Sequence, residues 1–449
     1  MPLSCRERFR PELNAVQYEA VFHDAGPLLV IAGAGSGKTR TLTYRAARLV
    51  EEGVPPGRIL LLTFTRKAAD EMLQRATRLL DNRCRQIAGG TFHSFAFTVL
   101  RRYAPQVGYP HRFTIIDRPD AESLIGMLMK ARRSAPRQGA FPRKRTLADI
   151  FSKAANKDLG LEEIIEAEYP HFGPYRDEIL TLQADYAAAK MEQALMDYDD
   201  LLIKLQHLLE SRIDLQEQIA AQFAHLMVDE YQDTNLIQAR IVYLLARQHQ
   251  RIMVVGDDSQ SIYSFRGANF RNIMDFPELF PETRILTLEE NYRSVAPILS
   301  LTNQLIQQAV EKYPKHLFSR KTLGNPPVLV HTGSENSQSR FIVDKIRELH
   351  REEIPLEDMA VLFRAGFHAF DLEVELAREG IAFVKYGGFK FMESAHIKDV
   401  LAHMRVLTNP YDRLSWTRIL LLIDKIGPKT AERLYDAIVN RADGLGGFI

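Results

Sequence analysis

The chain has 449 residues, of which 46% are hydrophobic and 26% are charged, and its formal net charge is +1. This length suits two to four domains, and the ordinary globular composition excludes wholesale disorder. The near-neutral charge excludes a globally basic surface for nucleic acid, so any such contact must come from local patches.

Cysteine usage and hydropathy indicate the compartment. The two cysteines, Cys5 and Cys84, stand outside any C-x-x-C pattern, which argues against a zinc site or a disulfide framework. The sequence opens without an apolar signal segment, and no run approaches the ~20 apolar residues of a membrane span. We therefore expect a cytoplasmic protein with no membrane partner.

Apolar runs alternate with helical patterns in the first part of the chain. Strands are expected at Leu28–Ile31, Ile59–Phe64, Leu226–Asp229, Ile252–Val255 and Ile285–Leu288, and helices at Thr41–Val50 and Lys67–Leu80. This alternation predicts a parallel sheet with helices on both faces. From residue 101 to 223 helical periodicity dominates and predicts a helical insertion, with helices at Ala121–Arg132, Ile179–Met191 and Leu201–Leu209.

A second α/β pattern follows Asn291. Strands are expected at Pro327–His331, Met359–Phe363 and Ala382–Tyr386, with helices at Ser337–His350 and Ala369–Arg378, and from Phe389 the pattern is helical again. The acid-free basic stretch from 130 to 145 indicates either a contact with a phosphate backbone or a solvated loop.

A glycine-rich turn joins the first strand to the first helix of the sheet. It has the sequence Ala32-Gly33-Ala34-Gly35-Ser36-Gly37-Lys38-Thr39. Its glycines let backbone N–H groups turn inward around an anion, at the positive end of the following helix. Lys38 would then reach the β- and γ-phosphates and Thr39 would hold Mg²⁺, so the turn predicts a nucleoside triphosphate site, although Ala32 stands where the strict pattern has glycine.

Two later strand ends carry matching chemistry. Asp229 can hold Mg²⁺ through water, and Glu230 can orient and deprotonate the water that attacks the γ-phosphate. Gln260 follows the next strand and suits a sensor of the γ-phosphate. Beyond it, Tyr263, Phe265 and Arg266 offer either a stacking platform for single-strand bases or ordinary core aromatics.

Together these motifs resemble those of superfamily 1 helicases of the UvrD/Rep/PcrA type, in which alanine also occurs at the position of Ala32. Leu13-Asn14-x-x-Gln17-x-x-Ala20 resembles the adenine-reading motif, and Asn291-Tyr292-Arg293-Ser294 resembles the motif that opens the second lobe. The resemblance implies ATP and Mg²⁺, with Gln17 on the base, Tyr292 stacked on adenine and Arg293 as an arginine finger. It also implies a place at the nucleotide site for Arg40 and Arg75.

The same resemblance implies contacts with single-stranded DNA. Residues 63–72 resemble a strand-gripping segment, with Phe64 against a base and Thr65 beside it, and Gly90-Thr91-Phe92-His93-Ser94 resembles the next DNA-contact motif. Tyr198 matches an aromatic position near DNA. The sequence departs from the family pattern at Ser259, Phe265 and Gly366, which stand where an acid, a tryptophan and an asparagine are usual.

Two further stretches leave alternatives open. The acids Asp197, Asp199 and Asp200 precede a helix, which favours N-terminal capping over a metal site. The stretch 426–434 indicates either a helix-hairpin-helix grip on a phosphate backbone or a plain helix start.

The resemblance implies a domain plan. A RecA-like ATP-binding lobe is expected at 1–92 and 224–290, a helical insertion at 93–223, the first part of a second RecA-like lobe at 291–388, and the start of that lobe's helical insertion at 389–449. The family's later Ser-Ala-Lys-Gly and Thr-Arg-Ala runs do not occur in the sequence. We therefore expect a truncated or partial helicase that binds ATP and DNA but unwinds poorly.

The expected function is ATP-dependent movement on single-stranded DNA and at duplex junctions, with 3′-to-5′ polarity implied by the resemblance. One alternative is a DNA-binding regulator that responds to ATP without unwinding. Another is a P-loop kinase of small molecules. The sequence identifies no protein partner and no pathway.

Overall fold

The computed structural model describes residues 5–132, 141–386 and 395–439. It divides into two compact units, Met1–Asn325 with Ala402–Ile449 and Pro326–Leu401. Within the described ranges, no helix has the length and apolar character needed to cross a bilayer.

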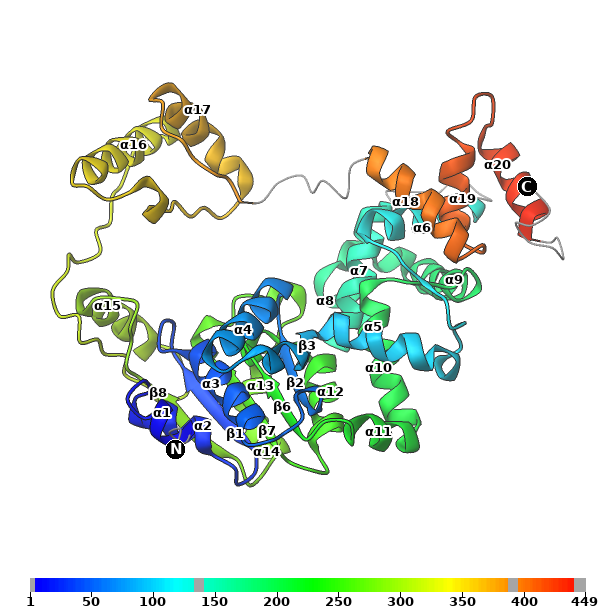
Figure 1. Ribbon diagram of the computed structural model, residues 1–449. Coiled ribbons are helices and arrows are strands. Elements are labelled where there is room, and N and C mark those ends of the chain that lie inside the picture. Colours follow the sequence, from blue (N-terminus) through cyan, green and yellow to red (C-terminus); the bar gives the residue numbers. More distant parts are fainter. Residues whose placement is uncertain (1–4, 133–140, 387–394, 440–449) are drawn as a thin grey trace. The chain divides into compact units, whose positions relative to one another are not determined.

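The centre of the first unit is a six-stranded parallel sheet in the order β3-β2-β6-β7-β1-β8 (Figure 1). Its strands are β1 Leu28–Ala32, β2 Ile59–Thr63, β3 Ala88–Thr91, β6 His225–Val228, β7 Ile252–Gly256 and β8 Arg284–Leu288. The five predicted strands are confirmed to within a residue or two at their ends, whereas β3, which contains two glycines, was not expected. Because all the strands are parallel, the turns that follow them meet at one edge of the sheet.

The sheet is buried on both faces, which explains its continuous apolar runs. Successive residues of β1 and β2 point to opposite sides: Leu29 and Leu60 join one core, Leu28 and Leu61 the other. The first core includes residues of α5 Phe92–Tyr103, α10 Tyr198–Ser211 and α12 Leu236–Ala246. The second includes residues of α2 Ala15–Phe22, α3 Lys38–Glu51 and α4 Arg66–Leu79. The predicted α/β class is confirmed.

The helical insertion has a core of its own. Its helices are α6 Arg118–Ala131, α7 Lys144–Lys157, α8 Leu161–Glu168, α9 Arg176–Glu192, α10 and α11 Ile213–Ala220. The three helices predicted in this region are confirmed. A short parallel pair, β4 Thr114–Ile115 with β5 Leu195–Met196, was not predicted because two-residue strands leave no periodic signal.

Two of the predicted acids, Asp197 and Asp200, form the N-terminal cap of α10. Asp197 accepts a hydrogen bond from the Asp200 backbone N–H at 2.9 Å, and Asp200 accepts one from the Asp197 N–H at 3.0 Å. Lys190 Nζ lies 2.6 Å from a carboxylate oxygen of each acid. The capping prediction is confirmed, and the described residues contain no cluster of three or more metal-ligating side chains.

The remaining helices of the first unit are α1 Cys5–Phe9, α13 Arg271–Met274, α14 Phe276–Leu279, α15 Ala296–Gln307, α19 Arg413–Leu420 and α20 Pro428–Val439, with α18 Ala395–Thr408 reaching across the boundary between the units. Arg405 of α18 lies 2.7 Å from Asp120 of α6. The nearby Asn409 Nδ2 donates to Thr114 Oγ1 at 3.1 Å. These bonds join the C-terminal helices to the helical insertion.

Residues 326–386 of the second unit form the α-helices α16 Glu335–Arg351 and α17 Phe370–Arg378, which pack through Val343, Leu372 and Leu376. Both helices were predicted. The three strands predicted there are wrong: residues 327–331, 359–363 and 382–386 form no strand and pair with no other segment among residues 326–386. A strand requires a hydrogen-bonded neighbour, and without one apolar residues such as Leu329, Leu362 and Val384 remain exposed.

Candidate nucleotide and nucleic-acid site

The glycine-rich turn between β1 and α3 closes tightly around its own backbone. Gly35 and Gly37 have φ of 78° and 93°, and Gly37 caps the N-terminus of α3. A Cβ on Gly37 would lie 2.6 Å from Gln17 Nε2, and one on Gly35 would lie 2.6 Å from Arg293 Cβ. Only glycine fits both the left-handed backbone and the space, so the turn keeps its N–H groups available for an anion.

Gln17 and Tyr292 lie beside this turn and are joined through Asn14. The buried Gln17 donates from Nε2 to the Ser36 carbonyl at 3.0 Å and accepts from the Asn14 backbone at 3.2 Å. Asn14 Nδ2 donates to the Tyr292 hydroxyl at 2.9 Å, and 44% of Tyr292 is exposed. Tyr292 therefore presents ring surface on the side of the turn that Gln17 holds.

The stretch that contains Arg293 is bonded to the phosphate-binding turn. Asn291 Nδ2 donates to the Ala34 carbonyl, and the Tyr292 N–H donates to the Gly35 carbonyl at 3.0 Å. These bonds place Arg293 next to Gly35. The structure thus brings together the phosphate-binding turn and the Asn291-Tyr292-Arg293-Ser294 motif, which lie more than 250 residues apart in the sequence.

The acids after β6 face the turn. Lys38 Nζ lies 2.7 Å from Glu230 Oε2, and Glu230 adopts a left-handed backbone with φ 49°. Asp229 is buried, and its Oδ1 has no hydrogen-bond partner among the described residues. Burial, with the adjacent Glu230 charge, raises the pKa of Asp229 to about 7. A divalent cation would satisfy this oxygen and keep the carboxyl ionised, so the donor set fits Mg²⁺.

A cavity of about 470 Å³, which we call the nucleotide cavity, opens beside these groups. Thr39, Asp229, Glu230 and Gln260 are among the residues that line it. Gln260 Nε2 donates to Asp257 Oδ2. Gln232 connects the two strand ends: its Nε2 donates to Glu230 Oε2 at 3.0 Å and its Oε1 accepts from the Asp257 N–H at 2.9 Å. We did not single out Gln232 or Asp257 from the sequence, although each stands inside a motif that we used.

The two arginines expected at the nucleotide have other partners. The Arg40 guanidinium donates to the Glu12 carbonyl at 2.7 Å and lies over the Tyr44 ring. Arg75 on α4 pairs with Glu71. Within the described part of the chain, no hydrogen bond or ion pair joins either guanidinium to the phosphate-binding turn.

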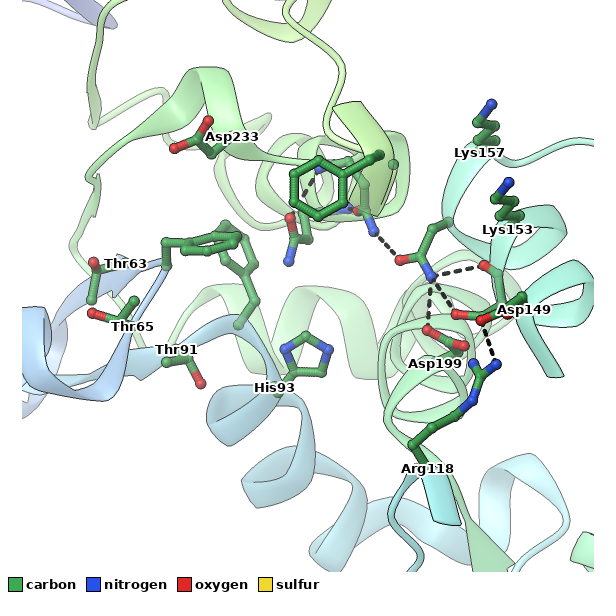
Figure 2. A pocket seen from close by; sticks show the side chains of 18 residues that line it. Thr63, Thr65, Thr91, His93, Arg118, Asp149, Lys153, Lys157, Asp199 and Asp233 are labelled. Atoms are coloured by element: carbon green, nitrogen blue, oxygen red, sulfur yellow. Dashed lines mark hydrogen bonds and ion pairs between the residues drawn. The ribbon is translucent and has the colours of Figure 1, made fainter. Parts of the chain in front are cut away.

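A second cavity, of about 510 Å³, lies between the sheet edge and the helical insertion (Figure 2). We call it the aromatic cavity. Thr65 and His93 line it from the sheet side, and Lys153, Lys157 and Arg118 line it from the insertion. Both lysines also pair with Glu168. The cavity therefore has a polar and aromatic wall opposite a largely cationic one, although Asp149 and Asp199 also line it.

Of the aromatic residues predicted to bind DNA, Phe64, His93 and Phe265 line this second cavity. Tyr263 lines the first cavity, and Tyr198 contacts the His93 ring. Ring centroids are 5.0 Å apart for Phe64 and Tyr263, 6.0 Å for Tyr263 and Phe265, and 5.9 Å for His93 and Tyr198. Phe265 is 61% exposed and Tyr198 52%, so neither is a core residue. Burial lowers the pKa of His93, which favours its neutral form. The side chain of Arg266 lies outside the described part of the structure.

The two cavities share a wall. Thr63, Phe64, Thr65 and Asp233 line both of them. Thr63 ends β2, Phe64 and Thr65 follow it, and Asp233 follows Glu230 by three residues. Groups that border the nucleotide cavity therefore also border the aromatic one. A displacement at one cavity can therefore reach the other through single side chains.

A parallel sheet that carries a phosphate-binding turn after β1 and acids after β6, with β7 between these two strands, defines a RecA-like P-loop nucleoside triphosphatase fold. Sequence profiles identify the branch: the UvrD/REP helicase N-terminal domain matches residues 13–281, and the UvrD-like helicase C-terminal domain matches residues 286–444. The chain belongs to the UvrD/REP helicase family, which confirms the resemblance seen in its motifs.

Individual relatives agree with this assignment. The chain is 37% identical over 411 residues to the ATP-dependent DNA helicase PcrA of Bacillus subtilis, an alignment that covers 91% of this chain and 55% of the relative. It is 34% identical over 429 residues to the PcrA helicase of Staphylococcus aureus, covering 94% of this chain and 57% of the relative. The chain thus spans a little over half the length of these relatives.

Proposed function

We propose that this protein couples ATP hydrolysis to movement along single-stranded DNA, with 3′-to-5′ polarity, and acts at junctions of duplex and single strand. The observation that carries the proposal is the wall shared by the two cavities, Thr63 to Thr65 with Asp233. The names of the relatives, ATP-dependent DNA helicases, support it. A regulator that binds DNA without hydrolysis is not favoured, because Glu230 and Gln260 both reach the nucleotide cavity.

Each group at the nucleotide cavity has a proposed role. The backbone from Gly33 to Gly37 cradles the phosphates, Lys38 and Arg293 neutralise their developing charge, and Gln260 senses the γ-phosphate. Glu230 takes a proton from the attacking water, and its hydrogen bond from Gln232 fixes its orientation. Gln17 and Tyr292 hold the adenine, whereas Arg40 and Arg75 would have to leave Glu12 and Glu71 to reach the nucleotide.

Mg²⁺ is the proposed metal. Thr39 and Asp229 line the same cavity, and the unpartnered Asp229 Oδ1 supplies an oxygen of the kind that Mg²⁺ prefers. When bound, the ion would neutralise charge on the β- and γ-phosphates.

The aromatic cavity is the proposed site for single-stranded DNA. Phe64, Tyr263 and Phe265 present their rings to bases, and His93 with Tyr198 forms a second ring pair beside them. We assign the parts of the chain accordingly. Residues 1–92 with 224–290 form the ATP-binding lobe, and residues 93–223 form the insertion that closes the aromatic cavity. Residues 291–388 form part of a second lobe, and residues 389–449 form the start of its insertion.

A phosphate-release assay with and without single-stranded DNA tests the proposal. We expect hydrolysis that single-stranded DNA stimulates, and we expect Lys38→Ala to abolish it because the main cation at the phosphates is lost. Lys345→Ala, which removes an exposed lysine on α16 that lines neither cavity, should keep the activity. Hydrolysis indifferent to DNA would favour a small-molecule kinase, and DNA binding without hydrolysis would favour the regulator.

A further inference from the structure

Lys315 forms a buried ion-pair cluster next to the nucleotide cavity. Its Nζ lies 2.5 Å from both Asp257 Oδ1 and Asp258 Oδ1, and the three side chains are only 3–4% exposed. Burying charges is costly unless they are paired, so the lysine and the two carboxylates depend on one another. None of the roles proposed above uses this cluster.

Asp257 connects the cluster to Gln260. One of its oxygens accepts from Lys315 Nζ and from the Ser259 N–H at 3.1 Å, and the other accepts from Gln260 Nε2. Lys315 thereby fixes the orientation of the carboxylate that holds the Gln260 amide. Because one Nε2 hydrogen is used in this way, the other hydrogen and Oε1 remain for the cavity.

The connection continues to the phosphate-binding turn. The Asp257 N–H donates to Gln232, which donates to Glu230, which in turn pairs with Lys38. A continuous series of bonds therefore runs from Lys315 to the lysine of the turn.

The segment that carries Lys315 is itself anchored at the turn. Leu317 packs against Gly33, where a Cβ would lie 2.6 Å from the leucine side chain. The Tyr313 hydroxyl donates to the Ile273 carbonyl at 3.2 Å. Phe318 accepts from the Asn291 N–H at 2.7 Å, two residues before Arg293. Movement of this segment would therefore displace the phosphate-binding turn, Arg293 and Gln260.

We propose that Lys315 is a positioning residue for ATP hydrolysis, which holds Gln260 at the γ-phosphate through Asp257. The inference rests on the proposed function. It adds a residue that touches neither nucleotide nor DNA but sets how the sensor meets the terminal phosphate.

Steady-state kinetics with saturating single-stranded DNA test this role. Lys315→Met should lower kcat about tenfold or more and change the KM for ATP less than about threefold, because Gln260 acts on the reacting phosphate rather than on the whole nucleotide. Lys315→Arg should restore part of kcat. The control is Lys312→Met, which should behave as the unmodified protein, because among the described residues the Lys312 amine donates only to carbonyls at the end of α15.

Nucleotide binding separates positioning from loss of fold. A partly unfolded variant would lose affinity for ADP and for a non-hydrolysable ATP analogue equally. If Lys315 positions the sensor, Lys315→Met should lower the preference for the analogue over ADP, and adding Lys315→Met to Gln260→Ala should cause little further loss of kcat. Additive losses would overturn the proposal.

A charge-matched variant tests whether an unbalanced charge in the cluster explains the loss of kcat. The cluster of one lysine and two aspartates has a formal charge of −1, and K315M/D258N keeps that charge while it removes the cation from Asp257. We expect its kcat to stay as low as that of Lys315→Met. Recovery in the double variant would show that charge balance alone matters and would overturn the proposal.

The proposed function and the role of Lys315 can be disproved separately. If the unmodified protein shows no DNA-stimulated hydrolysis, the proposed function falls and the role of Lys315 falls with it. If the unmodified protein hydrolyses ATP and Lys315→Met matches it in kcat and nucleotide preference, only the role of Lys315 falls.

Discussion

At the scale of single residues, the site retains groups that a purely structural protein would avoid. Glu230 has a left-handed backbone, which costs on the order of 1 kcal/mol or more for a residue other than glycine. Asp229 is buried beside it with an unpartnered oxygen. Phe265 is largely exposed although it is apolar. Each of these costs is understandable if the residue meets a ligand.

Phe265 allows a direct test of the stacking surface. Phe265→Ala should weaken binding of single-stranded DNA about 5- to 150-fold, since a stacked base contributes ~1–3 kcal/mol. Fluorescence anisotropy with a labelled oligonucleotide measures the change. Ile213→Ala removes an equally exposed apolar side chain from α11, outside the residues that line the cavity, and should leave the affinity unchanged. Equal affinities for both variants would contradict the stacking role.

At the scale of elements, the parallel order of the sheet brings most of the site residues to one edge. The turns after β1, β6 and β7 supply Lys38, Glu230 and Gln260, and those after β2 and β3 supply Phe64 and His93. Asn156 of α7 joins the insertion to this edge, because its Oδ1 accepts a hydrogen bond from Asn235 Nδ2 at 2.9 Å. Within the insertion, Asn156 also donates to Asp199 of α10 at 2.8 Å. The opposite ends of the strands have a different chemistry, with buried cations.

His225, at the start of β6, gives that opposite end a pH dependence. Burial, helped by the Arg45 guanidinium, lowers the pKa of His225 from 6.5 to about 4. Between these values the unfolded chain binds a proton that the folded chain excludes, so this residue lowers stability as pH falls from about 6.5 towards 4. His225→Gln should make the fall in melting temperature across that window shallower by a few degrees.

The matched control for this prediction is His207→Gln, which removes an exposed histidine from α10. Differential scanning fluorimetry at a series of pH values measures both variants. If the two substitutions give the same pH profile as the unmodified protein, His225 does not contribute to acid sensitivity.

At the scale of the whole molecule, the shared wall of the two cavities predicts that ATP and single-stranded DNA affect each other's binding. Thermodynamic linkage requires the effect to be reciprocal: the factor by which ATP changes DNA affinity must equal the factor by which DNA changes ATP affinity. We expect a coupling of about 5- to 150-fold, the usual range for allosteric pairs.

The variant Glu230→Gln makes this coupling measurable. It should bind Mg²⁺-ATP but hydrolyse it at least about a hundredfold more slowly, because no carboxylate remains to take the proton of the water. Titrating ATP at fixed DNA, and DNA at fixed ATP, gives the two factors. Independent binding, with both factors equal to one, would contradict a coupled pair of sites.

Local sequence patterns predicted much of this protein. The five predicted strands of the sheet follow from continuous apolar runs, and the phosphate-binding turn follows from glycines placed between a strand and a helix. The caps of α10 follow from acids at a helix start. These features depend on neighbours a few residues away, so the sequence contains most of their cause.

The failures have a common physical origin. The three strands expected in residues 326–386 have suitable apolar runs, but a strand exists only where another strand supplies its hydrogen bonds, and none is present in the described part of that unit. The short β4 and β5 pair only with each other, 81 residues apart, and show no period. Pairing is a property of the folded chain.

The sequence by itself determined the class of the protein, its phosphate-binding turn and the types of residue at its site. Only the tertiary structure decided that Gln17 holds Ser36, that Thr63 to Thr65 border two cavities, and that Lys315 pairs with Asp257 and Asp258. A lone lysine in a polar stretch has no distinguishing pattern. Its importance arises when folding buries it between two carboxylates, because in a medium of low dielectric constant an unpaired charge is costly and a paired one is held in place.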